Sequence, residues 1–305
     1  TSRYGFTKIE FVILINISVR FMRSILLHLR FPFSFFLMPV YWFALSQVIH
    51  IHFANALTVF LILHVLVYPA SNGYNSYMDR DTGSIGGIEN PEQPTKQLFY
   101  FTVMMDLAAI CLSYFISLFF MFGIIAYILA SRAYSYRGIR LKKYPVVGYL
   151  TVVVFQGCLT FFLVMHGCSI EKIMQVPVTA VLSTGLLIGG FYPLTQIYQH
   201  KQDKDDGVVS ISSLLGYKGT FIFTGIVYAL AVSCLGYYLI SSLQQTNFFV
   251  IQVFFIPVLA YFFWWYKKVN KDIRAANFKN TMRMNLLASL CSNFAFITLL
   301  ILEKI

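Results

Sequence analysis

The chain has 305 residues, of which 58% are hydrophobic and only 11% are charged. Soluble domains carry about 25% charged residues, so this composition excludes an ordinary soluble protein. Apolar runs of roughly 20 residues, long enough to cross a bilayer as a helix, recur along the whole sequence. Because these runs are continuous rather than alternating, they exclude a β-barrel. The net charge of +11 fits the positive-inside rule, and we expect no nucleic-acid partner.

The elements in chain order predict an all-α polytopic membrane protein. Residues 6–24 mix apolar and charged side chains, and we expect residues 1–24 to contain an amphipathic helix on the surface of the lipid bilayer. Nine transmembrane helices follow in a single domain over 1–305, which we expect to consist of two similar halves, about 25–144 and 145–305. The predicted helices span 30–48, 53–74, 97–118, 119–135, 145–166, 173–198, 219–240, 247–267 and 283–302.

The cationic residues between these helices predict the orientation. Only Lys172 and Lys304 fall on the side opposite the N-terminus. The other 21 of the 23 Lys and Arg residues fall in the N-terminal arm and in the loops near 78–97, 132–144, 199–218 and 267–283. The positive-inside rule makes this second set cytoplasmic. We therefore expect an integral protein of the bacterial inner (cell) membrane, with the N-terminus and the functional loops in the cytoplasm.

A polar stretch ends the second predicted helix. Asn75 and Asp79 are four residues apart and lie on one helical face, and Asn72 precedes Asn75 by three. Three oxygen donors on one face form half of a site for a hard cation such as Mg²⁺. The alternative is a helix end whose Asn and Asp side chains are only solvated.

A second polar stretch ends the sixth predicted helix on the same side. Gln199 and Asp203 are also four apart, and Gly207 follows four residues later. Asp205 and Asp206 add negative charge, although they fit a solvated loop edge equally well. Two acidic helix ends on one side predict a shared metal–diphosphate site more strongly than either does alone.

Five cations lie between Arg132 and Lys143, next to these acids in the predicted topology. Positive-inside bias explains some of them. Arg supplies a planar fork and Lys a point charge, so the segment also fits a phosphate clamp. Acids that hold Mg²⁺ beside bases that hold phosphate are the arrangement used where a diphosphate must leave.

Isolated polar residues inside the predicted helices are weaker signals. Asp106 is the only carboxylate well within an apolar run, and it fits an ion pair, a functional group or a helix end. We expect His64 and His166 to be hydrogen-bonded inside the bundle. Some of the 31 Phe and 20 Tyr residues could line a cavity for a long unsaturated chain and stabilise an allylic cation.

These motifs, in this order, resemble the UbiA-type superfamily of intramembrane prenyltransferases. That family has nine transmembrane helices around a central cavity and two Asp-rich motifs on the cytoplasmic side. Its first motif, N-x-x-N-D-x-x-D-x-x-x-D, is matched by Asn72, Asn75 and Asp79, with Arg80 and Asp81 following. The segment 90–95 is similar to the family's N-(K/R)-P-x-R-P segment.

The resemblance continues through the rest of the chain. Arg140, Lys142 and Lys143 resemble the family's basic substrate loop. Asp203 and Gly207 match its second motif, D-x-x-x-D-x-x-x-G, and residues 212–216 fit the usual continuation. The resemblance thus covers essentially the whole sequence.

Three positions depart from the family pattern. Ser76 replaces the Asp that follows the second Asn, the last Asp of the first motif falls at Gly83, and the first Asp of the second motif is Gln199. Fewer carboxylates imply weaker Mg²⁺ binding, use of Asp81 or of the pair 205–206, or one ion fewer.

The resemblance implies transfer of a prenyl group from a polyprenyl diphosphate to an aromatic or other lipophilic acceptor, with Mg²⁺ as cofactor. The implied roles are the following. Mg²⁺ is held by Asn75, Asp79, Asp81, Gln199 and Asp203. Catalysis depends on Asp79, Asp203, Lys142 and Arg140. The diphosphate is bound by Asn72, Asn75, Arg140, Lys142, Lys143, Tyr198 and Lys201.

Two other functions stay open from the sequence. A terpene cyclase of the same superfamily would capture the allylic cation with the substrate's own double bond, without an external acceptor. A membrane transporter or lipid carrier would move its substrate unchanged. The polar groups here gather on one side of the membrane, whereas transporter sites usually lie near the midplane.

Overall fold

The computed structural model describes residues 22–304. In that range nine helices are long and apolar enough to cross a membrane, which confirms the predicted count and the all-α fold class. The nine cover Met22–Ser46, Phe53–Asp79, Lys96–Tyr114, Leu118–Ser135, Pro145–Cys168, Val178–Gln196, Ile211–Ser241, Gln245–Lys271 and Phe278–Lys304. The part of the predicted surface helix before residue 22 lies outside the described residues.

Several spans consist of more than one helical segment. The first contains residues 22–29, α2 (Phe31–Ser34) and α3 (Met38–Ser46). The second contains α4 (Phe53–Leu61), the π-helical η1 (Ile62–Val67) and α5 (Tyr68–Asp79). The third and fourth are α6 (Lys96–Tyr114) and α7 (Leu118–Ser135). The fifth contains α8 (Pro145–Val152), the π-helical η3 (Val153–Leu159) and α9 (Thr160–Cys168).

In the second half of the chain each span from the sixth on is one helix, although the seventh bends at Gly216. The sixth to ninth spans are α10 (Val178–Gln196), α12 (Ile211–Ser241), α13 (Gln245–Lys271) and α14 (Phe278–Lys304). Short helices lie between spans: η2 (Leu141–Lys143), α11 (His200–Asp205) and η4 (Ile273–Ala275). An isolated bridge between Ile85 and Ile88 folds the 80–95 loop back on itself, and a second one joins Ile51 to Ser169.

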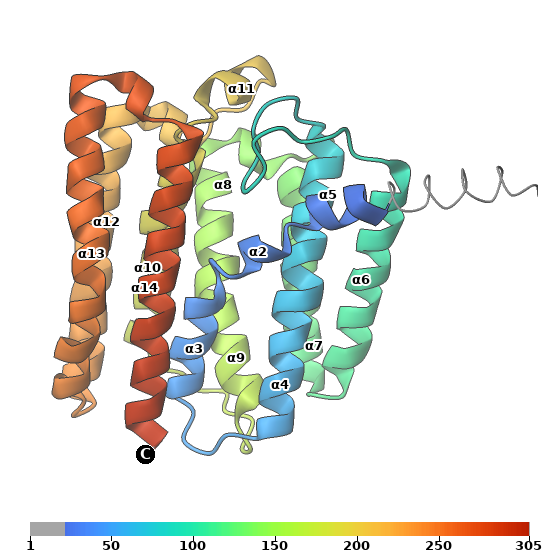
Figure 1. Cartoon of the computed structure of the whole chain (residues 1–305). Helices are drawn as coiled ribbons and strands as arrows, with labels where there is room; N and C mark the ends of the chain where they lie inside the picture. The colour runs from blue at the N-terminus through green and yellow to red at the C-terminus, as the bar shows by residue number, and fades with distance from the viewer. Residues whose placement is uncertain (1–21, 305) are drawn as a thin grey trace, which may run out of the picture.

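The bundle is held by apolar packing around two groups of helices. In Figure 1, α12, α13 and α14 stand on one side and α4 to α7 on the other. Helix α10 packs on α12 and on η3, while α14 packs on α3 and α13. The 80–95 loop and α11 lie at the same end, and the C-terminus lies at the opposite end (Figure 1). We call the end with α11 and the 80–95 loop the charged end.

Two helix boundaries differ from the sequence prediction in a way that matters for function. The second span, predicted to end at residue 74, continues to Asp79 and stops where Arg80 adopts a left-handed conformation (φ 53°). The seventh span begins eight residues early because the hydroxyl of Ser210 caps α12 at the backbone N–H of Ser213. Gly216, with φ 67°, then changes the direction of α12 close to the charged end.

Candidate active site

A cavity of about 140 Å³ lies at the charged end, and we call it the polar pocket. It is bounded by the end of α5, the 80–95 loop, the basic loop after α7, and the segment from the end of α10 to the start of α12. Its lining residues are Arg30, Phe33, Asn75, Asp79, Asp81, Ile85, Gly86, Tyr134, Lys142, Tyr192, Thr195, Gln196, Tyr198, Gln199, Gln202, Asp203, Asp206 and Val208.

Asp79 is the last residue of α5 and is only 7% exposed. Its carboxylate forms an ion pair with the Lys142 ammonium, and the Arg140 guanidinium lies 3.8 Å from the other carboxylate oxygen. That second oxygen, Oδ1, is buried and accepts no hydrogen bond from residues 22–304. The predicted contact between the first acidic stretch and the basic loop is therefore present, with one carboxylate oxygen left to bind a further cation.

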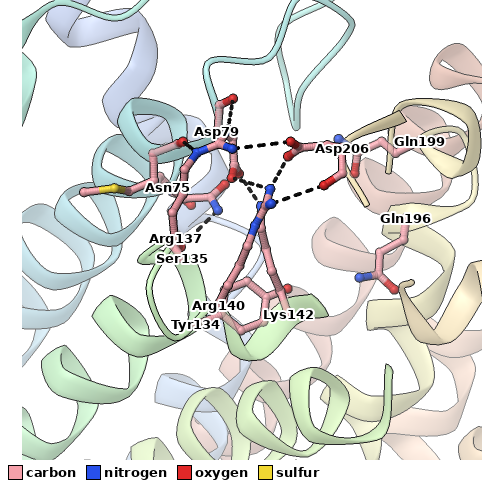
Figure 2. A network of polar contacts seen from close by, with 12 residues as sticks. Asn75, Asp79, Tyr134, Ser135, Arg137, Arg140, Lys142, Gln196, Gln199 and Asp206 are labelled. Carbon is pink, nitrogen blue, oxygen red and sulfur yellow. Dashed lines mark hydrogen bonds and ion pairs between the residues drawn. The ribbon is translucent and has the colours of Figure 1, made fainter. Parts of the chain in front are cut away.

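The basic loop also reaches the second acidic stretch. Arg140 forms an ion pair with Asp206 and donates to its backbone carbonyl at 3.2 Å. Arg137 donates to the Met78 carbonyl at 2.7 Å and lies 3.5 Å from the Asp206 carboxylate. Figure 2 shows these cations between Asp79 and Asp206. The loop after α7 thus joins the two halves of the site.

The two asparagines of the first stretch face different spaces. Asn75 lines the polar pocket and donates its amide N–H to the Ser135 hydroxyl of α7 at 3.0 Å. Asn72 lies one turn deeper and lines the neighbouring apolar cavity instead. Its backbone carbonyl accepts a hydrogen bond of 3.1 Å from Arg30. Asn75 is therefore the better placed of the two for a cation.

The carboxylates of the pocket raise one another's proton affinity. Burial, with repulsion from Asp79 and Asp81, raises the pKa of Asp203 to about 6, although Ser210 and Lys142 oppose the shift. Burial and the charge of Asp79 likewise raise the pKa of Asp81. Asp81 and Asp203 are thus less stable as anions than they would be in water, and a bound cation would relieve that penalty.

The second polar stretch, from Gln199 to Gly207, closes the polar pocket at the charged end of the molecule. Helix α11 ends at Asp205, and the chain turns at Gly207 (φ 66°), after which the backbone N–H of Val208 donates to the Asp203 carbonyl. Gln199 donates to the carbonyl of Ser84 at 3.4 Å, so the 80–95 loop and the α10–α11 connection touch. At Gly83, the position of a missing family Asp, a Cβ would lie 2.6 Å from the amide oxygen of Gln202.

Of the predicted cations, only Lys142 lines the polar pocket itself, while Arg137 and Arg140 contact its carboxylates without lining it. Lys143 and Lys201 are exposed and line neither cavity, and their proposed contact with a diphosphate stays a prediction. Arg132 points away from the pocket, forms an ion pair with Asp106 and lies over the ring of Tyr74. It is therefore not part of a phosphate clamp, and Asp106 is the partner of a buried cation.

Several pocket residues were not predicted from the sequence. Arg30 lines the pocket from the first span, where a single cation within an apolar run was the available signal. Asp206 had been left undecided between a loop edge and a ligand. Tyr134 and Tyr192 share a hydrogen bond between their hydroxyls, and Gln196 donates to Tyr192 at 2.8 Å. Aromatic residues in spans are too common for their sequence to mark these positions.

A larger apolar cavity of about 290 Å³ lies directly beneath the polar pocket. The two share a wall made of Arg30, Phe33, Asn75, Tyr134, Tyr192 and Thr195. Along α10 the apolar cavity reaches from Thr195 to Thr184, about 16 Å at the rise of a helix. Phenyl rings, including Phe36, Phe155 and Phe191, supply much of its surface.

The donor set of the polar pocket fits Mg²⁺ when a phosphate supplies additional ligands. Within residues 22–304, no three His, Cys, Asp or Glu side chains converge closely enough to hold an ion by themselves. Mg²⁺ commonly takes one or two protein carboxylates and completes its shell with water and substrate phosphates. The free oxygen of Asp79 and the raised pKa values of Asp81 and Asp203 are consistent with that mode.

Comparison with known proteins identifies the family. The model of the UbiA prenyltransferase family matches residues 34–287, and the chain therefore belongs to that family. Family membership makes it an integral membrane protein and, in general terms, one that transfers prenyl groups within the membrane. No curated protein sequence matches the chain.

Solved structures share the fold at low identity. A digeranylgeranylglyceryl phosphate synthase is 18% identical, with 92% of this chain and 99% of that chain covered and a TM-score of 0.60. A UbiA homologue from Archaeoglobus fulgidus bound to GPP and Mg²⁺ is 17% identical, with 90% and 99% covered and a TM-score of 0.67. An apo homologue from Aeropyrum pernix K1 is 16% identical, with 88% and 98% covered and a TM-score of 0.64.

Proposed function

We propose that this protein catalyses Mg²⁺-dependent transfer of a prenyl group from a polyprenyl diphosphate to an aromatic or other lipophilic acceptor, with release of diphosphate. One observation carries the proposal: a pocket of carboxylates and cations adjoins an aromatic cavity, and the two share part of their lining. A prenyl diphosphate has the same two parts. The Archaeoglobus fulgidus homologues, which bind DMAPP or GPP with Mg²⁺, support the assignment.

In this proposal the oxygen donors of the polar pocket would hold the metal. Bound Mg²⁺ supplies positive charge to the diphosphate and makes it a better leaving group. The residues proposed to hold it are Asn75, Asp79, Asp81, Gln199 and Asp203. Asp206 would not bind the metal but would hold the Arg140 guanidinium in position through their ion pair.

The basic side chains would neutralise the departing diphosphate. Lys142 and Arg140 already lie at the Asp79 carboxylate, so a diphosphate bound there falls within their reach. Tyr198 lines the same pocket and can donate its hydroxyl, because burial raises its pKa and keeps it protonated. Fixed cations at the position where negative charge develops stabilise the transition state.

The apolar cavity would receive the prenyl chain and the acceptor. Bond cleavage leaves an allylic cation next to the shared wall, which contains the aromatic side chains of Tyr134 and Tyr192. Aromatic faces attract a cation, and a cavity without bulk water protects it from hydrolysis. An acceptor carbon then forms the new bond and loses its proton. We also propose that the charged end faces the cytoplasm of a bacterial inner membrane.

The test is turnover by purified protein with Mg²⁺, farnesyl or geranylgeranyl diphosphate and a panel of aromatic acceptors, followed as diphosphate release. Asp79→Ala and the isosteric Asp79→Asn should each reduce the rate by about 10²-fold or more. Asp205→Ala is the matched control, because Asp205 is an exposed carboxylate that lines neither cavity. Thermal unfolding of each variant checks that it folds.

The same assay separates the alternatives. Product formed without any acceptor indicates a cyclase, in which a double bond of the chain captures the cation. Movement of the intact polyprenyl diphosphate across the membrane of vesicles, without covalent change, indicates a transporter. Wild-type turnover in Asp79→Ala contradicts the proposed site.

A further inference from the structure

The wall of the apolar cavity contains a polar stripe that the proposed chemistry does not use. Helix α14 contributes Asn285, Ser289 and Ser292 to the lining, at helical spacings that place them on one face. Polar side chains within a transmembrane helix are costly unless they have partners or a function. A structural explanation would require that these groups hydrogen-bond to neighbouring helices.

Asn293, on the same helix, has that structural explanation. It is 4% exposed, and its amide donates to the Phe35 carbonyl at 3.2 Å and to the Ser289 carbonyl at 2.8 Å. The first bond joins α14 to the connection between α2 and α3. Asn293 therefore ties helices together and does not line the cavity.

Asn285 differs from Asn293 in its position and in its amide nitrogen, although the Oδ1 atom of Asn293 also lacks a hydrogen-bond partner among the described residues. It is also 4% exposed, but it lines the cavity, and its amide nitrogen has no hydrogen-bond partner in the part of the chain that the structure describes. Leaving a buried polar group unsatisfied costs free energy that a well-placed ligand would recover. The unsatisfied amide of Asn285 thus points to a ligand that provides an oxygen atom.

The depth of Asn285 relates that ligand to the reaction. Phe278, near the start of α14, packs against Tyr198 of the polar pocket, with ring centroids 5.3 Å apart. Asn285 follows Phe278 by seven residues, which places it about 10 Å deeper along the helix axis. It therefore lies below the proposed diphosphate and beside the space for the prenyl carbons and the acceptor.

The charge of the cavity defines the chemical class. Among residues 22–304, Arg30 is the only charged side chain in the lining, and it lies in the wall shared with the polar pocket. The remaining polar lining consists of hydroxyl and carboxamide groups, which bind neutral oxygen atoms but do not compensate a buried carboxylate.

We propose that Asn285 recognises an uncharged oxygen function, a carbonyl or a hydroxyl group, on the ring of a lipophilic acceptor. The inference rests on the proposed prenyl transfer and specifies its acceptor: a neutral oxygenated ring without a carboxylate at that position. Ser289 and Ser292 extend the same polar face and accommodate a second oxygen on the ring.

The experiment measures binding of three defined probes to the purified full-length protein by native mass spectrometry. The probes are 2,3-dimethyl-1,4-naphthoquinone, its oxygen-free counterpart 2,3-dimethylnaphthalene, and the anion 2-naphthoate. Wild type should bind the quinone about fivefold more tightly than the hydrocarbon, which is the typical worth of one hydrogen bond, and more tightly than the anion. Asn285→Leu keeps the side-chain volume and should reduce the quinone-to-hydrocarbon ratio to about one.

Asn293→Leu is the matched control. It removes the same amide from the same helix and should lower the unfolding temperature while keeping the ratio of the wild type. The inference is overturned if the ratio of quinone affinity to hydrocarbon affinity is equal in wild type and Asn285→Leu, or if it is near one in wild type. Tighter binding of 2-naphthoate than of the quinone overturns the neutral class.

A parallel titration with farnesyl diphosphate and Mg²⁺ keeps this inference separate from the proposed function. Wild type and Asn285→Leu should both bind farnesyl diphosphate in a Mg²⁺-dependent manner, because the groups proposed to hold the diphosphate and the metal lie in the polar pocket, which Asn285 does not line. Failure of the wild type to bind it would defeat the proposed prenyl transfer, whatever the quinone ratio. If farnesyl diphosphate binds normally but the quinone-to-hydrocarbon ratio is unchanged in Asn285→Leu, only the proposed role of Asn285 is defeated.

Discussion

Lys142 and Lys143 are neighbours in the basic loop, yet only Lys142 faces the polar pocket. Lys142 is half-buried at the Asp79 carboxylate, whereas Lys143 is exposed and lines neither cavity. The sequence assigns both to the same substrate loop. The short η2 helix separates them, because its tight turn directs consecutive side chains to different sides.

Substitution of these two lysines tests the difference. Lys142→Met should lower the rate of diphosphate release by about 10²-fold, because a fixed cation no longer meets the leaving group. Lys143→Met should change the rate by less than about twofold, the scale of an exposed charge. Steady-state assays with farnesyl diphosphate measure both. Equal losses would show that the loop acts through its total charge and not through one contact.

Asp203 should make Mg²⁺ binding in the polar pocket dependent on pH. Its pKa of about 6 lies above its ordinary value, so the carboxyl is neutral in acid and becomes anionic as pH rises through 6. Protons therefore compete with Mg²⁺ below that pH. The Mg²⁺ concentration needed for half-maximal turnover should rise about tenfold between about pH 7.5 and pH 5.

Asp203→Asn is the control for this titration. It cannot ionise, so its requirement for Mg²⁺ should be high at both pH values and nearly independent of pH. A wild-type requirement that is equally independent of pH would exclude Asp203 from the metal site.

At the scale of elements, the ion pair of Asp106 and Arg132 joins α6 to α7. Arg132 also lies over the ring of Tyr74, the residue before Asn75 on α5. Three spans are therefore held together one turn away from the hydrogen bond of Asn75 to Ser135. The pair fixes the position of the α5 end that carries the oxygen donors.

Removing one partner of the Asp106–Arg132 pair should lower the stability of the protein more than removing both. Arg132→Met leaves the Asp106 charge without compensation in an apolar environment, at a cost of about 3 kcal/mol or more. The double variant Asp106→Asn with Arg132→Met should recover most of the loss in unfolding temperature. A double variant no more stable than Arg132→Met would contradict this explanation.

The sequence predicted the helices better than it predicted their ends. Continuous apolar runs defined nine spans, because the bilayer imposes length and hydropathy on each. Asp79 was expected beyond the second span and is in fact its last helical residue. Polar residues at a helix end carry no hydropathy signal, so only backbone geometry, such as the left-handed Arg80, determines where the helix stops.

The same limit applies to the site. Spacing and family resemblance pointed to Asn75, Asp79, Asp203 and Lys142, which the structure brings into one pocket. Arg132 had been grouped with the clamp by proximity in sequence, but a buried carboxylate on another helix holds it elsewhere. Asn285 could not be chosen from the sequence, because its importance lies in a missing partner and not in its residue type.

At the scale of the whole molecule, the distribution of cations predicts the orientation in the membrane. Asp205 lies at the charged end, and Leu243 lies in the short turn between α12 and α13 at the opposite end. Both side chains are exposed. They are therefore suitable positions for accessibility labelling. The predicted similarity of the two halves stays a prediction.

A membrane-impermeant maleimide should label Asp205→Cys only in inside-out vesicles and Leu243→Cys only in right-side-out vesicles, with the parent protein as background. This outcome follows from the 21 of 23 Lys and Arg residues on the charged side. The reverse pattern would place the charged end outside the cell and contradict the proposed cytoplasmic site.

The ion pairs of the basic loop have a thermodynamic consequence. Asp79 is paired with Lys142 and Asp206 with Arg140, so a divalent cation that binds Asp79 competes with an ammonium group for the same carboxylate. A diphosphate, in turn, competes with the carboxylates for the same ammonium and guanidinium groups. Each ligand releases a partner that the other can bind, and linkage requires that the gain in affinity be equal in both directions. Metal and diphosphate should therefore bind as a cooperative pair, each weakly when alone.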